Sequence, residues 1–429
     1  MTDTHNKGKK IAVIGGGAAG MMAAIYAADV ASESGEKADV TVFERNKKTG
    51  AKLRITGKGR CNVTNNSDVR EFMNSIVNNP KFLYSALNFL TPAATIALFE
   101  ENMRVPLKTE RGMRVFPASD NAHDIANALE RYALSKKVKI SCSRVKAICI
   151  NDSKISGLVT ENGVGEIPFD SVIIATGGLS YPKTGSDGDG YKLAKSAGHT
   201  VTECRPSLVP IETARDVSAL AGLSLKNVTL KITETNDGKE KIVFSELGEC
   251  LFTHFGLSGP LILSASAHIQ NLGEKIYTAF IDLKPALDEA ALDRRLLSDF
   301  QKYNNRDFIN SLSDLLPNLL IPYITAESEI PERIKVNSIL KEQRKVLLTL
   351  MKSLPFELSR FRPIDEAVVT AGGISVKEIN PKTMESKIAA GLYFAGEVID
   401  VDAYTGGYNL QIAFSTGALA GKSAASTEQ

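Results

Sequence analysis

The sequence predicts an α/β protein built on a parallel sheet, with an antiparallel β region and a helical region inserted into it. Apolar strand and helix patterns alternate over residues 10–44, which is typical of a parallel sheet with crossover helices. Strand-like segments separated by turn residues follow from about Gly198, and residues 286–354 carry apolar side chains at helical spacing. Glycine-rich segments return from about Arg362, so we expect the end of the chain to rejoin the first region.

The expected elements follow in chain order. The first region is predicted to contain strands at 10–14, 39–44, 138–143, 145–150 and 171–175, and helices at about 17–31, across 81–101 and around 125–132. Thr91 and Pro92 are placed as a helix N-cap and first helical residue. A loop rich in Gly, Lys, Arg and Asn covers 46–66. The antiparallel region is predicted to contain strands at 201–211, 228–233, 241–244 and 276–283.

Composition is that of an ordinary globular chain. Its 429 residues, 43% hydrophobic and 23% charged, suggest about two or three domains. The net charge of +2 does not by itself indicate a nucleic-acid partner, although it leaves room for a local basic patch. The five cysteines form no CxxC pair, which argues against a disulfide framework or a zinc site and favours a reducing compartment.

Targeting and metal signals are weak. The polar N-terminus, MTDTHNKGKK, resembles neither a signal peptide nor an anchor, and no uninterrupted apolar run reaches the roughly 18 residues of a membrane span. The acidic segment Asp187-Gly-Asp189 lacks the ligand count and spacing of a calcium loop. We therefore expect a soluble cytoplasmic protein with no membrane partner and no metal.

The segment Gly15-Gly16-Gly17-Ala18-Ala19-Gly20 matches GxGxxG between a predicted strand and a predicted helix. In that context the first glycine turns the chain, the second lets the backbone approach a pyrophosphate, and the third lets the helix pack on the sheet. Glu44 ends the next strand, where a carboxylate can accept hydrogen bonds from both hydroxyls of an adenosine ribose. These features predict a dinucleotide site and leave FAD and NAD open.

Three later segments favour FAD. Residues 52–62 form a loop with four basic side chains, and residues 173–178 form an apolar strand that ends in Ala-Thr-Gly-Gly, as in flavoproteins with two dinucleotide-binding motifs. Residues 391–397 form a strand that ends in Gly-Glu, followed by Asp400 and by a helix that opens near Tyr408. The positive end of that helix could stabilise the negative charge that develops on flavin N1 and O2 during reduction.

Four quoted motifs carry a resemblance to a known family. ITGKGRCNVTN, ATGGLSYPKTGSDGDGYKLAKSAGHT, LFTHFGLSGP and GLYFAGEVIDVDAYTGGYNLQIAFSTG resemble the YhiN/BaiN-like, or aminoacetone-oxidase-like, FAD-dependent oxidoreductases. The resemblance implies a Rossmann-like FAD-binding domain (1–198 and 362–429), an inserted antiparallel β-barrel (199–285 and 354–361) and a helical insert (286–353). The sequence has Thr56-Gly57-Lys58-Gly59 where family members are more glycine-rich, which adds a charge near the cofactor.

The resemblance also implies which residues hold noncovalent FAD. Toward the adenosine and pyrophosphate these are Gly15, Gly17, Ala19, Gly20, Glu44, Arg45, Lys52 and Val145. Toward the pyrophosphate and flavin, with Lys52, lie Arg60, Cys61 and Asn62. At the ribitol and flavin ring are Gly396, Asp400, Gly407, Tyr408, Asn409, Leu410 and Gln411. Further residues expected to contact FAD are Gly59, Ala175, Thr176, Gly177 and Glu397. The sequence does not identify a catalytic acid or base; His254, Arg60 and Tyr404 are the candidates.

The expected activity is hydride transfer between flavin N5 and a small-molecule substrate at the junction of the FAD and inserted domains. NAD(P)H would bind only transiently, because no second nucleotide-binding domain is found. One alternative is a reductase that acts on a uridine of ribosomal RNA, and an alternative of another class is a non-catalytic redox sensor. An RNA substrate needs a basic path, which could be supplied by Lys52, Arg54, Lys58, Arg60, Arg111 and Arg114. The first four could instead neutralise the FAD pyrophosphate. Oligomeric state is not predicted.

Overall fold

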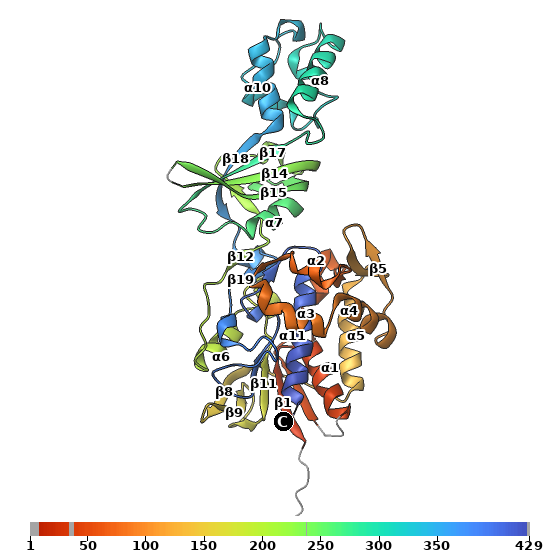
Figure 1. Cartoon of the computed structure of the whole chain (residues 1–429), viewed down its shortest axis with the longest axis vertical. Helices are drawn as coiled ribbons and strands as arrows, with labels where there is room; N and C mark the ends of the chain where they lie inside the picture. Colours follow the sequence, from red (N-terminus) through yellow and green to blue (C-terminus); the bar gives the residue numbers. More distant parts are fainter. Residues whose placement is uncertain (1–7, 34–37, 237, 427–429) are drawn as a thin grey trace, which may run out of the picture. The chain divides into compact units, whose positions relative to one another are not determined.

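The chain divides into two compact units in a computed structural model that describes residues 8–33, 38–236 and 238–426. The first unit comprises Met1–Ser207 with Ile364–Gln429, and the second comprises Leu208–Pro363. Both ends of the chain therefore contribute to the first unit (Figure 1). The polar segment at residues 1–7, expected not to be a signal peptide, lies outside the described residues.

A five-stranded parallel sheet is the centre of the first unit, with the strand order β20-β11-β1-β2-β7. Its strands are β1 (Lys9–Ile14), β2 (Ala38–Glu44), β7 (Lys139–Cys142), β11 (Ser171–Ile174) and β20 (Leu392–Phe394). In chain order, β2 and β7 are added on one side of β1, and β11 and β20 are then added on the other side. The sheet therefore has a switch point between β1 and β11. Doubly wound sheets bind ligands at the carboxyl ends of the strands beside such a point.

Two alanine-rich helices, α1 (Ala18–Glu33) and α11 (Tyr408–Ala425), pack against each other through their backbones. A Cβ added to Gly417 would lie 2.3 Å from the Ala19 carbonyl oxygen, and one added to Gly421 would lie 2.0 Å from that of Ala23. Only glycine permits this approach. Gly421 and Ala23 each lie four residues after Gly417 and Ala19, so the two contacts follow the same direction in both helices and the helices run parallel.

The remaining elements of the first unit surround the sheet. The helices are α2 (Val69–Met73), α3 (Tyr84–Phe89), α4 (Pro92–Ala97), α5 (Ala122–Ser135) and α6 (Asp189–Ser196). A hairpin pairs β5 (Leu107–Glu110) with β6 (Arg114–Pro117), and β6 also pairs with β3 (Thr64–Asn65). The other strands are β4 (Ile76–Asn78), β8 (Val145–Asn151), β9 (Lys154–Thr160), β10 (Ile167–Pro168), β12 (Arg205–Ser207), β19 (Val369–Ala371) and β21 (Asp402–Ala403).

The second unit is a closed antiparallel barrel with the strand order β13-β16-β15-β14-β17-β18 (Figure 1). Its strands are β13 (Ile211–Thr213), β14 (Ser224–Asn236), β15 (Lys239–Phe252), β16 (Gly256–Ser258), β17 (Ile276–Asp282) and β18 (Leu354–Phe361). Helix α7 (Pro260–Ser266) precedes β17, and α8 (Glu289–Lys302), α9 (Ile321–Glu327) and α10 (Lys341–Lys352) lie between β17 and β18 in the chain. The predicted combination of a parallel Rossmann-like sheet with an antiparallel barrel is confirmed.

The helical region across 81–101 is divided at the predicted N-cap: Leu90 is extended (φ −126°), Thr91 accepts from the Ala94 N–H, and Pro92 starts a new helix, as predicted. One predicted element is wrong in detail. The single strand at 201–211 is divided into β12 and β13, because Leu208 between them is left-handed (φ 55°). A left-handed residue interrupts an extended strand.

No single helix in the described ranges is long and apolar enough to span a membrane. The helical segments Pro80–Phe89 and Pro92–Asn102 together have the length and apolar composition of a membrane span, but they are bent by 44°. Their apolar side chains Leu83, Leu87 and Phe99 are buried in the core of the first unit.

Candidate functional site

Parallel pairing brings the predicted nucleotide-binding segments to one edge of the sheet. The Gly15 N–H donates to the Phe43 carbonyl at 2.8 Å, and the Ala175 N–H donates to the Ile14 carbonyl at 2.9 Å. The Ala395 N–H in turn donates to the Ile174 carbonyl at 3.0 Å. The glycine turn, the end of β2, Ala175 to Gly177 and Gly396 therefore meet at the carboxyl ends of adjacent strands.

The glycines of the turn differ in what a side chain would meet. Gly15 has φ 103°, and a Cβ there would lie 2.5 Å from the Ala175 carbonyl oxygen. A Cβ on Gly20 would lie 1.9 Å from the Gly15 carbonyl oxygen. A Cβ on Gly17 would meet nothing within 4 Å. The first and last glycines are thus required by packing, whereas Gly17 borders open space at the start of α1, as expected for the position that a pyrophosphate approaches.

Glu44, at the end of β2, is 9% exposed and holds the turn. Its carboxylate accepts from the Gly16 N–H and from the Asn46 N–H, both at 2.8 Å. Each carboxylate oxygen has capacity for one further donor, so Glu44 can accept from a ribose hydroxyl while it holds the turn. Arg45 points elsewhere, because its guanidinium pairs with Asp187 at 2.5 Å.

Lys52 joins three segments that are far apart in sequence. Its ammonium donates to Glu397 at 2.7 Å and to the Ser180 hydroxyl at 2.6 Å. Glu397 also accepts from the Ser180 hydroxyl and from the Thr370 N–H, each at 2.9 Å. Lys52 and Glu397, both predicted to contact the cofactor, therefore already stabilise each other, and Ser180 and Thr370 complete the cluster.

The loop after Lys52 carries four of the predicted residues: Gly59, Arg60, Cys61 and Asn62. The Arg60 guanidinium pairs with Glu110 and Asp120 and lies over the Phe116 ring with its carbon 4.2 Å from the centroid. These carboxylates raise the pKa of Arg60 and offset its charge. Cys61 is fully buried and left-handed (φ 61°), and burial raises the pKa of its thiol to about 12. The thiol is therefore neutral and shielded near neutral pH. A Cβ on Gly59 would meet nothing within 4 Å.

The start of α11 is held against this loop. Its N-cap, Gly407, has φ 97°, and a Cβ there would lie 2.3 Å from the Thr64 carbonyl oxygen. The Asn409 side chain donates to the Ala403 carbonyl at 2.7 Å and accepts from the Ala403 N–H at 3.0 Å. Asn409 thus fastens the preceding chain to the first turn of the helix.

Gln411 lies in the core. It is fully buried; its side-chain oxygen accepts from the Thr64 hydroxyl at 2.6 Å, and its amide group donates to Leu90, Thr95 and Ser415. This network positions β3 and the chain before α4 behind the first turn of α11. Thr64 was not among the predicted residues, although it stands in the RCNVTN motif.

Three other predicted residues occupy different surroundings. Asp400 lies near Thr202, and burial raises the pKa of its carboxyl. Tyr404 is half-buried, with its N–H donating to the Ser75 carbonyl at 2.9 Å. His254 is exposed in the second unit and makes an edge contact with Phe255. Within the described ranges, no group of three or more His, Cys, Asp or Glu is placed to hold a metal ion.

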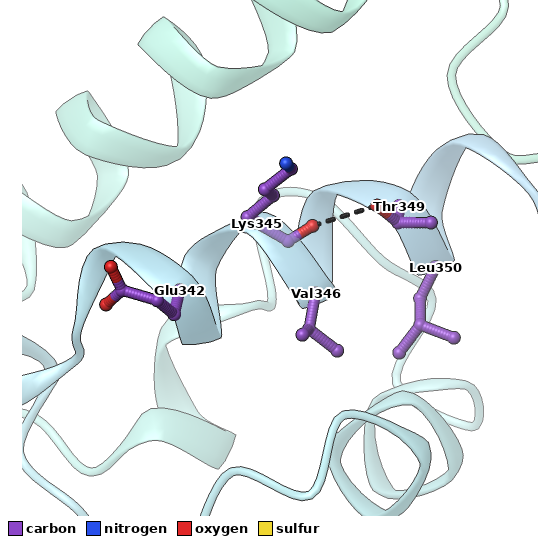
Figure 2. A pocket seen from close by; sticks show the side chains of 5 residues that line it. All are labelled: Glu342, Lys345, Val346, Thr349 and Leu350. Atoms are coloured by element: carbon purple, nitrogen blue, oxygen red, sulfur yellow. Dashed lines mark hydrogen bonds between the residues drawn. The ribbon is translucent and has the colours of Figure 1, made fainter.

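A surface depression on α10 is separate from these residues. It is lined by Glu342, Lys345, Val346, Thr349 and Leu350, and Figure 2 shows the Val346 and Leu350 side chains on the same side of the helix. None of the five is a predicted site residue.

The starts of the two parallel helices α1 and α11 are displaced from each other along the helix direction. Gly417 of α11 packs against Ala19 of α1. Nine residues of α11 precede Gly417, whereas one residue of α1 precedes Ala19. At 1.5 Å per residue, the N-terminal end of α11 therefore extends about 12 Å beyond that of α1. The positive end of α11 therefore lies beyond that of α1 along their shared direction. Open space at Gly17 and Gly59 is consistent with a ligand at these positions.

Comparison with known proteins agrees with this geometry. The model of the HI0933-like protein Rossmann domain family matches residues 9–423. The chain belongs to this family of flavin-dependent oxidoreductases.

Relatives in the family span the full chain. A 3-dehydro-bile acid delta(4,6)-reductase from Clostridium scindens is 32% identical over 97% of this chain and 99% of its own length. A ribosomal RNA dihydrouridine synthase from Escherichia coli is 30% identical over 94% and 95%. Among solved structures, 3-ketosteroid delta1-dehydrogenase from Sterolibacterium denitrificans has a TM-score of 0.50 at 12% identity, covering 97% of this chain and 99% of that one, which indicates a shared fold.

Proposed function

We propose that this member of the family is a reductase that uses noncovalent FAD to saturate a carbon–carbon double bond conjugated to a carbonyl group. The observation that carries the proposal is the pair of parallel helix starts at one sheet edge, because it provides separate positions for a pyrophosphate and for a flavin ring. When bound, the flavin supplies the hydride chemistry at N5.

The substrate class is supported by what two relatives have in common. One is named as a reductase of a 3-dehydro bile acid at its 4,6 double bonds, and the other makes dihydrouridine. In both reactions a double bond conjugated to a ring carbonyl is saturated. Such a bond accepts hydride at its far carbon because negative charge then moves to the carbonyl oxygen.

Each part of the chain has a defined task in this proposal. The backbone at Gly17 and the start of α1 hold the pyrophosphate, and Glu44 accepts from the ribose hydroxyls. The first turn of α11, at Tyr408 to Leu410, would lie at the ring, where its positive end favours the reduced form. The Lys52–Glu397 pair joins the loop at 52–62 to the end of β20 and so keeps the cradle assembled.

Anaerobic stopped-flow measurements test this function. The purified yellow protein is reduced with NADH or NADPH and then mixed with a steroid 4-en-3-one or with RNA that contains uridine. We expect flavin reoxidation coupled to loss of the conjugated absorbance. A protein whose reduced flavin reacts with oxygen but with no conjugated acceptor would instead fit an oxidase or a redox sensor.

Acid precipitation tests how the cofactor is attached. The sequence contains no recognisable flavinylation motif, so all of the flavin should enter the supernatant. Flavin that stays in the pellet would contradict noncovalent binding.

A further inference from the structure

We propose that FAD binding stabilises both strands that connect the two units, so that these connections open more readily in the FAD-free protein. The chain leaves the first unit after Ser207 and returns to it at Ile364. On the first-unit side of these two crossings lie β12 (Arg205–Ser207) and β19 (Val369–Ala371), which we call the connecting strands. The proposal rests on the proposed function, because it requires that FAD occupies the site described above.

The connecting strands form a two-stranded sheet of their own. Arg205 pairs antiparallel with Ala371, and Ser207 pairs with Val369 (Figure 1). A two-stranded sheet is only marginally stable unless it packs against other parts of the protein. The stability of the connecting strands therefore depends on the segments that they contact.

The outgoing strand, β12, is held by the buried carboxylate of Asp402. The Ser207 hydroxyl is fully buried and donates to Asp402 at 2.8 Å, and the Asn78 amide donates to the same carboxylate. Asp402 itself is 1% exposed. Burial raises the pKa of Asp402, whereas the bonds from Asn78 and Ser207 and the nearby positive charge of Arg205 lower it. Both ends of β12 therefore interact with one buried carboxylate.

The returning strand, β19, is held by the carboxylate of Glu397. Thr370 is fully buried, and its N–H donates to Glu397 at 2.9 Å. The Thr370 hydroxyl accepts from the N–H groups of Leu179 and Ser180 at 2.8 and 3.2 Å. Because Glu397 also accepts from Lys52 at 2.7 Å, it joins β19 to the loop that follows Lys52.

The two anchoring carboxylates belong to the flavin end of the proposed cofactor site. Glu397 lies just after β20, and Asp402 directly precedes Ala403. The N–H and carbonyl of Ala403 both bond to the side chain of Asn409 in the first turn of α11, at 3.0 and 2.7 Å. A flavin at this end of the site would therefore contact one continuous segment, 396–409, that carries both anchors.

Backbone strain favours opening of the connections when these contacts weaken. Leu208, which directly follows β12, is fully buried and left-handed (φ 55°), a conformation that a leucine keeps only where its surroundings enforce it. A ligand that binds only the assembled site shifts the equilibrium toward the closed form. At a free FAD concentration 100 times its dissociation constant, an opening that requires FAD to leave becomes about 100-fold rarer.

Hydrogen–deuterium exchange of the full-length protein, with and without FAD, measures these openings. Peptides that cover β12 and β19 are compared with peptides from the barrel strands β14 and β17. The variant Ser207→Ala removes the bond to Asp402. The matched control Ser171→Ala removes another buried serine hydroxyl of the first unit, one that donates to the Ala424 carbonyl at 3.4 Å. Flavin absorbance measures the occupancy of each sample.

In the parent protein, we expect this FAD concentration to slow exchange in both connecting strands by about 100-fold, and exchange in β14 and β17 by less than about twofold. In Ser207→Ala, the slowing in β12 should fall to about tenfold, because the variant lacks one hydrogen bond to a charged group. Ser171→Ala should retain the slowing of the parent protein.

Equal slowing in the connecting strands and in β14 and β17 would overturn the proposal, as would a Ser207→Ala protein that behaves like Ser171→Ala. A protein that binds no FAD would overturn it together with the proposed function. Enone reduction is assayed separately on the same samples. FAD-dependent protection of the connecting strands without enone reduction would support the proposal and would count against the reductase function alone.

Discussion

The two ends of the proposed cofactor site are built by different means. At the ADP end, Gly15, Gly20 and Glu44 are fixed by backbone contacts at the edge of the parallel sheet. At the flavin end, the chain is held by side-chain bonds between distant segments, such as Lys52 with Glu397 and Thr64 with Gln411. The first kind of site can be specified by a short motif, whereas the second needs the whole fold.

The largest effect is expected in the glycine turn, where two substitutions distinguish a glycine required by packing from a glycine at the proposed ligand contact. Gly20→Ala should destabilise the protein by roughly 3 kcal/mol and abolish FAD binding, because its Cβ would overlap the Gly15 carbonyl oxygen. Gly17→Ala should leave the stability of the FAD-free protein within about 0.5 kcal/mol and weaken FAD binding at least about tenfold, because its Cβ enters open space. Urea unfolding and flavin titration measure the two quantities. Equal losses of stability in Gly20→Ala and Gly17→Ala would contradict the distinction between a packing glycine and a ligand-contacting glycine.

At the flavin end, Gln411→Leu should cost about 2 to 3 kcal/mol, because it leaves the buried Thr64 hydroxyl and Leu90 carbonyl without their amide partner. Ser415 still donates to the Leu90 carbonyl, which limits the loss. The flavin of the variant should also become more accessible to iodide quenching as the start of α11 loosens. Ser359→Ala, in the second unit, serves as the control for removing an exposed hydrogen bond. A stability unchanged from that control would contradict the role of Gln411.

The third effect concerns the electrostatics of α11. Leu410→Glu should have a lower flavin reduction potential than Leu410→Gln by about 6 to 40 mV. A charge in the first turn of a helix is worth about 0.3 to 2 kcal/mol, and 1.4 kcal/mol is about 30 mV for two electrons. The pair differs only in charge. Asn409→Asp is less suitable, because the new carboxylate would face the Ala403 and Tyr404 carbonyls. Equal midpoints in redox titrations would exclude this helix end from tuning the flavin.

The smallest expected effect lies away from both ends. His199 is buried, with Nε2 2.7 Å from the Ser386 hydroxyl, and burial lowers its pKa, although Glu378 acts in the opposite direction. A lowered folded pKa means that the unfolded chain binds the proton more tightly. The stability from His199 is therefore fully present above the ordinary value of about 6.5 and declines as pH falls below it. His199→Gln should make the urea midpoint less dependent on pH between 7.5 and 5.5, by less than about 1 kcal/mol. An unchanged dependence would show that His199 does not contribute.

The limits of sequence-based prediction follow the same division. The strand–glycine–helix unit and Glu44 could be predicted because their geometry is local. The sequence could not reveal that Arg60 faces Glu110 and Asp120, or that Gln411 lies in the core, because these contacts depend on tertiary packing of separated segments. Thr64 and Asn65 could have been noticed, since they complete the quoted motif RCNVTN. The new helix after Leu90 could be predicted from Thr91 and Pro92, whereas the left-handed Leu208 that divides the predicted strand at 201–211 could not, because leucine rarely adopts that conformation.

The contact between α1 and α11 also has a consequence for biosynthesis. Strands β1 and β2 are made more than 340 residues before β20 and α11, which complete the same sheet and helix layer. At about 5 to 20 residues per second, that interval is roughly 20 to 70 seconds. During this time the apolar faces of β1 and α1 lack their final neighbours, whereas the barrel can close as soon as β18 is made. FAD capture therefore follows the synthesis of α11, and a shortage of flavin would leave a chain whose barrel is already closed exposed to chaperones and proteases at its α1–α11 layer.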